Sequence, residues 1–172
     1  VPMAALTVWQ GMMEHTHLKA GQTVLVNGAA GGTGHIAVQL AKARGAQVIG
    51  VASGRHEAFL YALGVDEFVD YTTTSLEQMA HEVDVAIDTV GTMGENPLLA
   101  TLKPGGTLLW IGLHPLNNGV TGTEVTEAGV TIEKFQVRSN GAHLVAISEL
   151  IDAGQLRVVV DTVVPLAEAW KA

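Results

Sequence analysis

The sequence predicts an α/β fold built on a doubly wound parallel sheet of about six strands, in the order 3-2-1-4-5-6. Short apolar runs typical of buried strands alternate with amphipathic helical segments along most of the chain. Hydrophobic residues make up 48% of the 172 residues and charged residues only 15%, as expected where strands are buried on both faces. A chain of this length can bury one core without disulfides, and it contains no cysteine.

The first strand and its flanking helices are the clearest elements. Residues 2–17 carry apolar side chains at a loose helical spacing, and Gly21 closes the turn that follows. Residues 23–26, Thr-Val-Leu-Val, form an uncharged run between glycines and predict a buried strand. Residues 35–43 predict a helix with one apolar face, formed by Ile36, Ala37, Leu40 and Ala41.

The same alternation continues toward the end of the chain. Five further strands are expected, over residues 47–52, 67–70, 84–89, 107–111 and 130–137. Three further helices are expected, over residues 57–63, 96–102 and 142–153. Residues 104–106, Pro-Gly-Gly, predict a turn, and residues 130–137 are expected to form an edge strand. Residues 156–164 form a last strand-like run without a following helix, which predicts a segment that leaves the domain.

The acidic balance of the chain limits its partners. Its formal net charge is −8 and no basic stripe offsets it, which argues against nucleic acid and against acidic membrane surfaces. Residues 21–41 and 104–123 lack charge over a length that could span a bilayer, but Gly, Asn, Gln and Thr interrupt both stretches. No signal peptide is visible. We therefore expect a soluble, cytoplasmic protein with no membrane contact.

A glycine-rich turn joins the first strand to its helix. Residues 28–34 read Gly-Ala-Ala-Gly-Gly-Thr-Gly, which fits the Rossmann dinucleotide fingerprint as Ala29-x-Gly31-x-x-Gly34, with Ala in place of the first Gly. Such a turn lets bare main chain approach a diphosphate, and the start of the following helix attracts negative charge. The spacing alone is weak evidence in a chain with 20 glycines, but the strand before it and the helix after it strengthen the assignment. No Gly-Lys-Ser/Thr follows, which excludes a P-loop.

The end of the second strand favours NADP(H) as the cofactor. NAD-binding sequences usually place Asp or Glu there to hold the ribose hydroxyls. Here residues 50–56 read Gly-Val-Ala-Ser-Gly-Arg-His, and the first acid is Glu57. The hydroxyl of Ser53 and the guanidinium of Arg55 could instead hold a 2′-phosphate. The alternative is that Arg55 is an ordinary solvated surface residue.

Several segments together resemble the quinone-oxidoreductase-like branch of the medium-chain dehydrogenases/reductases, which are related to the zinc-type alcohol dehydrogenases. The resemblance covers nearly the whole chain, and only the glycine turn is specific by itself. The matching segments are residues 4–9 (Ala-Ala-Leu-Thr-Val-Trp), 29–34 (with Thr33 where Val is usual), 41–46, 70–71, 88–91 (Asp-Thr-Val-Gly), 102–106 (Leu-Lys-Pro-Gly-Gly) and 154–161.

The resemblance implies a role for each part of the site. Thr7 would approach the nicotinamide, and Ser53, Arg55 and Tyr71 would meet the adenosine 2′-phosphate. The diphosphate would be held by backbone amides of the glycine turn, from Ala30, Gly31, Gly32 and Thr33. The nicotinamide ribose would be lined by Thr89, Val90, Gly91, Ile111, Gly112 and Leu113.

Structural roles are the alternative for several of these residues. Thr7 could simply pack in its helix, Tyr71 could cap a strand, and Val90 and Ile111 could belong to the core. Asp88 is expected to form a turn rather than to act as a catalytic acid.

The remaining polar residues have weaker claims to a function. His15 and His17 could chelate a metal but are expected to be surface residues, and His114 is a weak candidate for substrate contact. Zinc is not supported within this chain, and no residue is a convincing catalytic acid.

The resemblance also implies a domain organisation. Residues 1–20 would be an interdomain helix and turn, residues 21–155 the dinucleotide-binding domain, and residues 156–172 a segment that returns toward a missing N-terminal substrate domain. The parent protein would be an NADP-dependent oxidoreductase that transfers hydride to a quinone, enone or carbonyl, and the fragment alone is expected to be inactive. The alternative is a non-catalytic dinucleotide-binding sensor or structural module. Members of the family pair through the sheet edge, which implies a homodimer.

Overall fold

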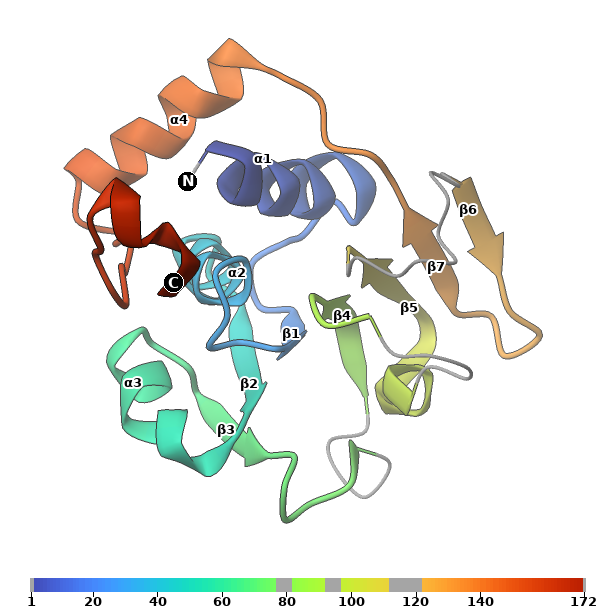
Figure 1. Ribbon diagram of the computed structural model, residues 1–172. Coiled ribbons are helices and arrows are strands. Elements are labelled where there is room, and N and C mark those ends of the chain that lie inside the picture. The colour runs from blue at the N-terminus through green and yellow to red at the C-terminus, as the bar shows by residue number, and fades with distance from the viewer. Residues whose placement is uncertain (1, 77–81, 92–96, 112–121, 172) are drawn as a thin grey trace.

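A seven-stranded sheet forms the centre of the molecule, in the order β3-β2-β1-β4-β5-β7-β6 (Figure 1). The computed structural model describes residues 2–76, 82–91, 97–111 and 122–171. All neighbouring strands pair in parallel except β6 and β7, which are antiparallel. The strands are β1 (Thr23–Asn27), β2 (Gln47–Ala52), β3 (Glu67–Asp70), β4 (Val83–Asp88), β5 (Leu102–Trp110), β6 (Gly122–Val125) and β7 (Thr131–Lys134). The predicted doubly wound parallel sheet is confirmed, with one strand more than expected.

Helical segments cover both faces of this sheet. The helices are α1 (Pro2–Gln10), which continues as a π-helix (Gly11–His15), α2 (Gly34–Ala43), α3 (Glu57–Ala62) and α4 (Gly141–Asp152). Short 3₁₀-helices occupy Gly54–His56, Pro97–Thr101 and Leu166–Lys171. Val24 and Val26 of β1 pack in one buried cluster with the four α-helices, whereas Leu25 packs in a second cluster with Leu98 and β5. The central strands β1, β2 and β4 are therefore buried on both sides, which explains the high hydrophobic content.

The segment from Pro97 to Trp110 departs from the prediction. The helix expected over residues 96–102 is a 3₁₀-helix, Pro97–Thr101, and Leu102 already belongs to β5. The turn expected at residues 104–106 lies inside that strand, where the register against β4 shifts between Val83 and Val85. Gly105 has a φ of +80°, a conformation that glycine adopts without strain, so the strand can bulge there and then resume its pairing.

The sheet edge also differs from the prediction. Residues 130–137 were expected at the edge, but β7 lies between β5 and β6, and β6 is the outer strand. All four residues of β6 are exposed, so this segment lacks the buried alternation that marks a strand in a sequence. A tight turn joins the two strands, with the Thr126 amide donating to the Val130 carbonyl at 2.9 Å. Only this pairing makes residues 122–125 a strand.

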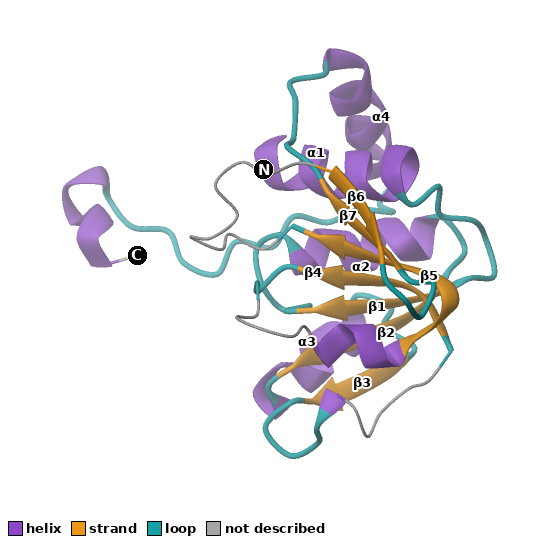
Figure 2. Cartoon of the chain, turned by 90° about the vertical axis from the view of Figure 1, so that its right-hand side faces the viewer, coloured by secondary structure: helices purple, strands orange, loops and turns teal. Residues whose placement is uncertain are grey.

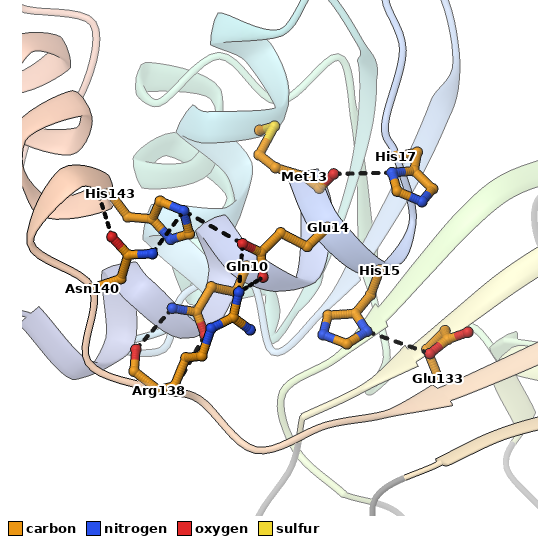
Figure 3. A network of polar contacts seen from close by, with 9 residues as sticks. All are labelled: Gln10, Met13, Glu14, His15, His17, Glu133, Arg138, Asn140 and His143. Carbon is orange, nitrogen blue, oxygen red and sulfur yellow. Dashed lines mark hydrogen bonds and ion pairs between the residues drawn. The ribbon is translucent and has the colours of Figure 1, made fainter.

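Two buried glutamine side chains hold irregular segments against the helices by bonding to the main chain of those segments. The Gln10 amide donates to the Arg138 carbonyl at 2.8 Å and accepts from the Arg138 amide at 3.0 Å (Figure 3). Gln39 does the same with Arg157, donating to its carbonyl at 3.0 Å and accepting from its amide at 2.7 Å. Each glutamine side chain thereby supplies the donor and the acceptor that a neighbouring strand would otherwise provide, because neither segment pairs with a strand.

The C-terminal part of the chain leaves the sheet. Residues 156–164, which were expected to be strand-like, form no strand in the described structure, although Leu156 is buried. Figure 2 shows the last helix, Leu166–Lys171, standing away from the sheet. Its Leu166 and Trp170 are 92% and 80% exposed. No helix among the described residues is long and apolar enough to cross a bilayer.

Candidate binding site at the carboxyl edge of the sheet

A pocket of about 350 Å³ lies where the turns after β1, β2, β3 and β4 meet. The site residues predicted from the sequence that line it are Ala30, Gly31, Ser53, Arg55, Tyr71, Thr89 and Val90. Gly28, Ala52 and His56 complete the wall and were not predicted. The neighbouring positions of β1 and β4 in the sheet bring the first and the last of these turns together.

The turn after β1 is as tight as the glycine fingerprint requires. Gly28 has a φ of +76°, and the amides of Gly28 and Ala29 both donate to the Val51 carbonyl, at 3.1 and 3.0 Å. A Cβ at Gly34 would collide with the Gly28 carbonyl and the Ala29 Cα, so the start of α2 presses directly on this turn. The third glycine of the motif therefore serves close packing of helix on strand.

The first turn of α2 leaves donors available for a ligand. Thr33 is the N-cap residue, and its side chain makes no capping hydrogen bond. Among the described residues, the backbone amides of Gly32 and Thr33 donate no hydrogen bond to another backbone group. A Cβ built at Gly32 would meet no atom within 4 Å, so this position faces open space. Free amides and the helix dipole together favour an anion at this point.

The turn after β2 carries the exposed Arg55. Its Nε donates to His56 Nε2 at 3.0 Å, and the guanidinium forms no ion pair with a carboxylate in the described part of the chain. Ser53 is half-buried and precedes it in an extended conformation. Arg55 is therefore a cation available at the rim of the pocket.

Asp70, at the end of β3, is an acid that was not expected beside this turn. Its Oδ1 accepts from the amide and the hydroxyl of Thr72, at 2.9 and 2.7 Å. Its Oδ2 lies so close to Gly54 that a Cβ there would come within 2.5 Å. Hydrogen bonds from Thr72, and then from the Gly54 backbone, hold the pKa of Asp70 below its ordinary value. The register of β2 and β3, which pairs Ala52 with Asp70, is the signal that places this acid here.

The loop after β4 is organised by a fully buried acid. Asp88 Oδ1 accepts from the Asn27 side chain and from the amides of Val90 and Gly91, each at 3.1 Å. The Thr89 hydroxyl donates to the Asn27 carbonyl at 2.7 Å. Asp88 thus shapes the loop that lines the pocket, in keeping with the turn-forming role expected for it.

Other predicted site residues lie outside this pocket. The Thr7 hydroxyl donates to the Met3 carbonyl one helical turn earlier, at 2.8 Å, and the Ile111 amide donates to the Asp88 carbonyl at 3.0 Å. Gly32 lines a neighbouring pocket of about 260 Å³ together with His35, Phe59, Val159 and Asp161. Thr33 caps α2, and Gly91 is held by Asp88. Gly112, Leu113 and His114 lie outside the described residues.

The family of the chain follows from comparison with known proteins. A family model described as zinc-binding dehydrogenase matches residues 63–172, which is more than half of the chain. The relatives and structural neighbours of this chain are quinone-oxidoreductase-like proteins. This chain is a medium-chain dehydrogenase/reductase.

Similar proteins agree with this assignment. The mouse mitochondrial NAD(P)H oxidoreductase RTN4IP1 is 31% identical over the whole of this medium-chain dehydrogenase/reductase chain, which covers 50% of the mouse protein. The tomato (Solanum lycopersicum) 2-methylene-furan-3-one reductase is 33% identical over 94% of the chain, which covers 38% of that protein. The structure of the Coxiella burnetii quinone oxidoreductase superposes with a TM-score of 0.85 at 28% identity, over 99% of this chain and 53% of that one. The chain thus spans about half the length of curated relatives that it matches over its whole length.

The family name implies zinc, but the residues that the structure describes in this medium-chain dehydrogenase/reductase do not form a zinc site. The sequence contains no cysteine, and the described residues include no group of three or more His, Asp or Glu side chains placed to hold a metal ion. The histidines near the π-helix have structural contacts instead (Figure 3): His15 stacks on Phe135 with ring centroids 4.4 Å apart, and His17 contacts the Met13 carbonyl. His15 is partly exposed, with 27% of its side chain accessible to solvent.

Proposed function

We propose that this chain forms the dinucleotide-binding part of an NADPH-dependent oxidoreductase. The observation that carries the proposal is the pocket at the ends of β1 to β4, with the uncapped start of α2 beside it. Open parallel sheets bind nucleotides in such a crevice, where neighbouring strands connect to opposite sides. The amides of Gly32 and Thr33 would donate to the diphosphate, next to Ala30 and Gly31.

The preference for NADPH rests on the charges around the turn after β2. Arg55 and Ser53 face the pocket, and Tyr71 lines it from the next strand. Asp70, at the end of the neighbouring strand β3, is not part of the pocket lining, and its oxygens face Thr72 and the Gly54 backbone. This carboxylate therefore supports the turn that carries Arg55, and the guanidinium is left to pair with a 2′-phosphate.

The reaction we propose is reduction of a quinone, enone or carbonyl by the parent protein. When bound, the nicotinamide supplies the hydride. The residues of this chain would bind and orient the cofactor: Thr89, Val90 and Gly91, held in place by Asp88, would border the nicotinamide ribose, with Thr7 and Ile111 nearby. The names of the mouse and tomato relatives, an NAD(P)H oxidoreductase and a furanone reductase, support this reaction class.

Titration with NADPH and NADH, followed by tryptophan fluorescence or calorimetry, tests the proposal. We expect tighter binding of NADPH, and Arg55→Ala should weaken it about tenfold without changing NADH affinity, because one charge-assisted contact is lost. Arg44→Ala is the matched control, since Arg44 is an exposed arginine at the opposite end of α2. Unchanged NADPH affinity in Arg55→Ala would overturn the 2′-phosphate assignment, and NADPH binding without turnover by the parent would favour a sensor.

A further inference from the structure

A buried histidine lies between the glycine turn and the C-terminal segment. His35, in the first turn of α2, is only 5% exposed. Its Nδ1 lies 2.9 Å from the Gly31 carbonyl, and its backbone amide donates to the same carbonyl at 3.0 Å. On the other side of the ring, the Val159 amide donates to Nε2 at 3.3 Å. One side chain thus joins two segments that are 124 positions apart.

These contacts favour one tautomer of the ring. A backbone amide can only donate, so Nε2 must be the unprotonated nitrogen that accepts from Val159. The proton of the neutral imidazole is then on Nδ1, which donates it to the Gly31 carbonyl. The contact with Val159 therefore selects the tautomer that can hold Gly31.

The hold on the Gly31 carbonyl orients the next amide. A trans peptide is planar, so its C=O and N–H point in opposite directions, and the described chain contains no cis peptide. With two donors fixing the Gly31 carbonyl, the Gly32 N–H is directed away from His35. A Cβ at Gly32 would face open space, and Gly32 and His35 line the same pocket of about 260 Å³.

A second tether keeps Val159 in register with the ring. Gln39, one turn further along α2, holds both main-chain groups of Arg157. Residues two apart in an extended segment present their main-chain groups to the same side, so the fixed position of Arg157 brings the Val159 amide to His35. The backbone of the C-terminal segment is thereby aligned on α2, next to the buried side chain of Leu156.

We propose that His35 is a positioning residue for the cofactor diphosphate: its Nδ1–H fixes the Gly31–Gly32 peptide so that the Gly32 amide donates to the ligand, and Val159 locks the tautomer that does this. The proposal rests on the proposed function, because it requires a dinucleotide at this turn. Dinucleotide affinity is then linked to docking of residues 157–159 on α2.

Three substitutions of His35 separate the two ring contacts. In His35→Asn the amide nitrogen takes roughly the place of Nδ1, and in His35→Gln the amide oxygen takes roughly the place of Nε2, whereas His35→Leu retains neither. NADPH and NADH are titrated against each variant, together with adenosine 2′-monophosphate, which lacks the diphosphate. If NADH proves to be the preferred dinucleotide, adenosine is titrated in place of adenosine 2′-monophosphate. Hydrogen exchange at the Val159 amide reports the second contact.

We expect His35→Leu and His35→Gln to lose about tenfold in dinucleotide affinity, because the Gly32 amide would no longer point at the diphosphate. The affinity of His35→Asn should stay within about twofold of wild type. Binding of the probe without a diphosphate should be unchanged in all three, which also verifies that the pocket is folded. Exchange at Val159 should accelerate in the Asn and Leu variants but not in Gln. Wild-type affinity in His35→Gln, equal weakening of every probe, or equal loss in Asn and Leu would overturn the inference. A wild-type chain that binds neither dinucleotide would overturn the proposed function itself.

Discussion

At the scale of single residues, buried polar side chains determine where the turns of this molecule lie. Asp88, Gln10 and Gln39 are each buried, and each one holds main-chain groups of a loop or an irregular segment. Asp84 plays a similar part at the amino ends of the strands, where it accepts from the Thr23 amide at 2.8 Å and pairs with Lys103. Burial of such a group is tolerated because its hydrogen bonds are satisfied.

Asp84 makes the fold sensitive to acid. Burial by itself would raise the pKa of Asp84, but the hydrogen bond and charge of Lys103 and the Thr23 amide together bring the pKa below its ordinary value. A depressed pKa in the folded state means that the stabilisation is complete above about pH 4 and is lost as the pH falls through the folded value. We therefore expect the free energy of unfolding, measured by urea titration, to decline below about pH 4. Asp84→Asn should flatten that decline and lower the stability at pH 7. A decline as steep as that of wild type in Asp84→Asn would contradict this assignment.

At the scale of elements, the unit formed by β1, its glycine turn and α2 carries most of the candidate site. The strand and helix of this unit were predictable because local apolar patterns set both of them. The turn between them was predictable because Gly28 adopts a left-handed backbone that favours glycine. The amides of Gly32 and Thr33 form no backbone hydrogen bond in the described part of the chain. The individual ligand roles of the predicted residues stay predictions.

Two glycines of this unit should respond differently to the same substitution. In Gly34→Ala the new methyl group meets the Gly28 carbonyl, so we expect a loss of about 1–3 kcal/mol in the free energy of unfolding, as for other overpacked sites. In Gly32→Ala the methyl group enters open space, so stability should be unchanged while dinucleotide affinity falls. Chemical denaturation and NADPH titration of both variants measure the two effects. A stable Gly34→Ala, or full affinity in Gly32→Ala, would contradict the packing described for this turn.

At the scale of the whole molecule, exposed apolar side chains mark the outer edge of β6 and part of the C-terminal segment. Val125 of β6 is 70% exposed, and Val163 is 86% exposed. The family resemblance implies a homodimer through the sheet edge and a substrate domain beside the C-terminal segment. The edge concerned is β6 rather than residues 130–137.

We expect the chain to self-associate through β6, because an uncovered strand edge presents unpaired backbone groups. Sedimentation velocity over a range of concentrations should show a dimer whose fraction rises with concentration. Val125→Lys should reduce that fraction by placing a charge on each of the paired edges, whereas Val163→Lys serves as a control on the other surface. A monomer at all concentrations would exclude pairing through β6.

The sequence by itself determined the alternation of strands and helices, the glycine turn and the lack of an acid between Ser53 and His56, because each depends on residues within a few positions of one another. The tertiary structure decided the rest. The strand identity of Gly122–Val125 depends on pairing with β7, the place of Asp70 depends on the register of β2 and β3, and the link from Val159 through His35 to Gly31 crosses most of the chain. Such contacts form only when folding brings distant segments together, so no local pattern records them.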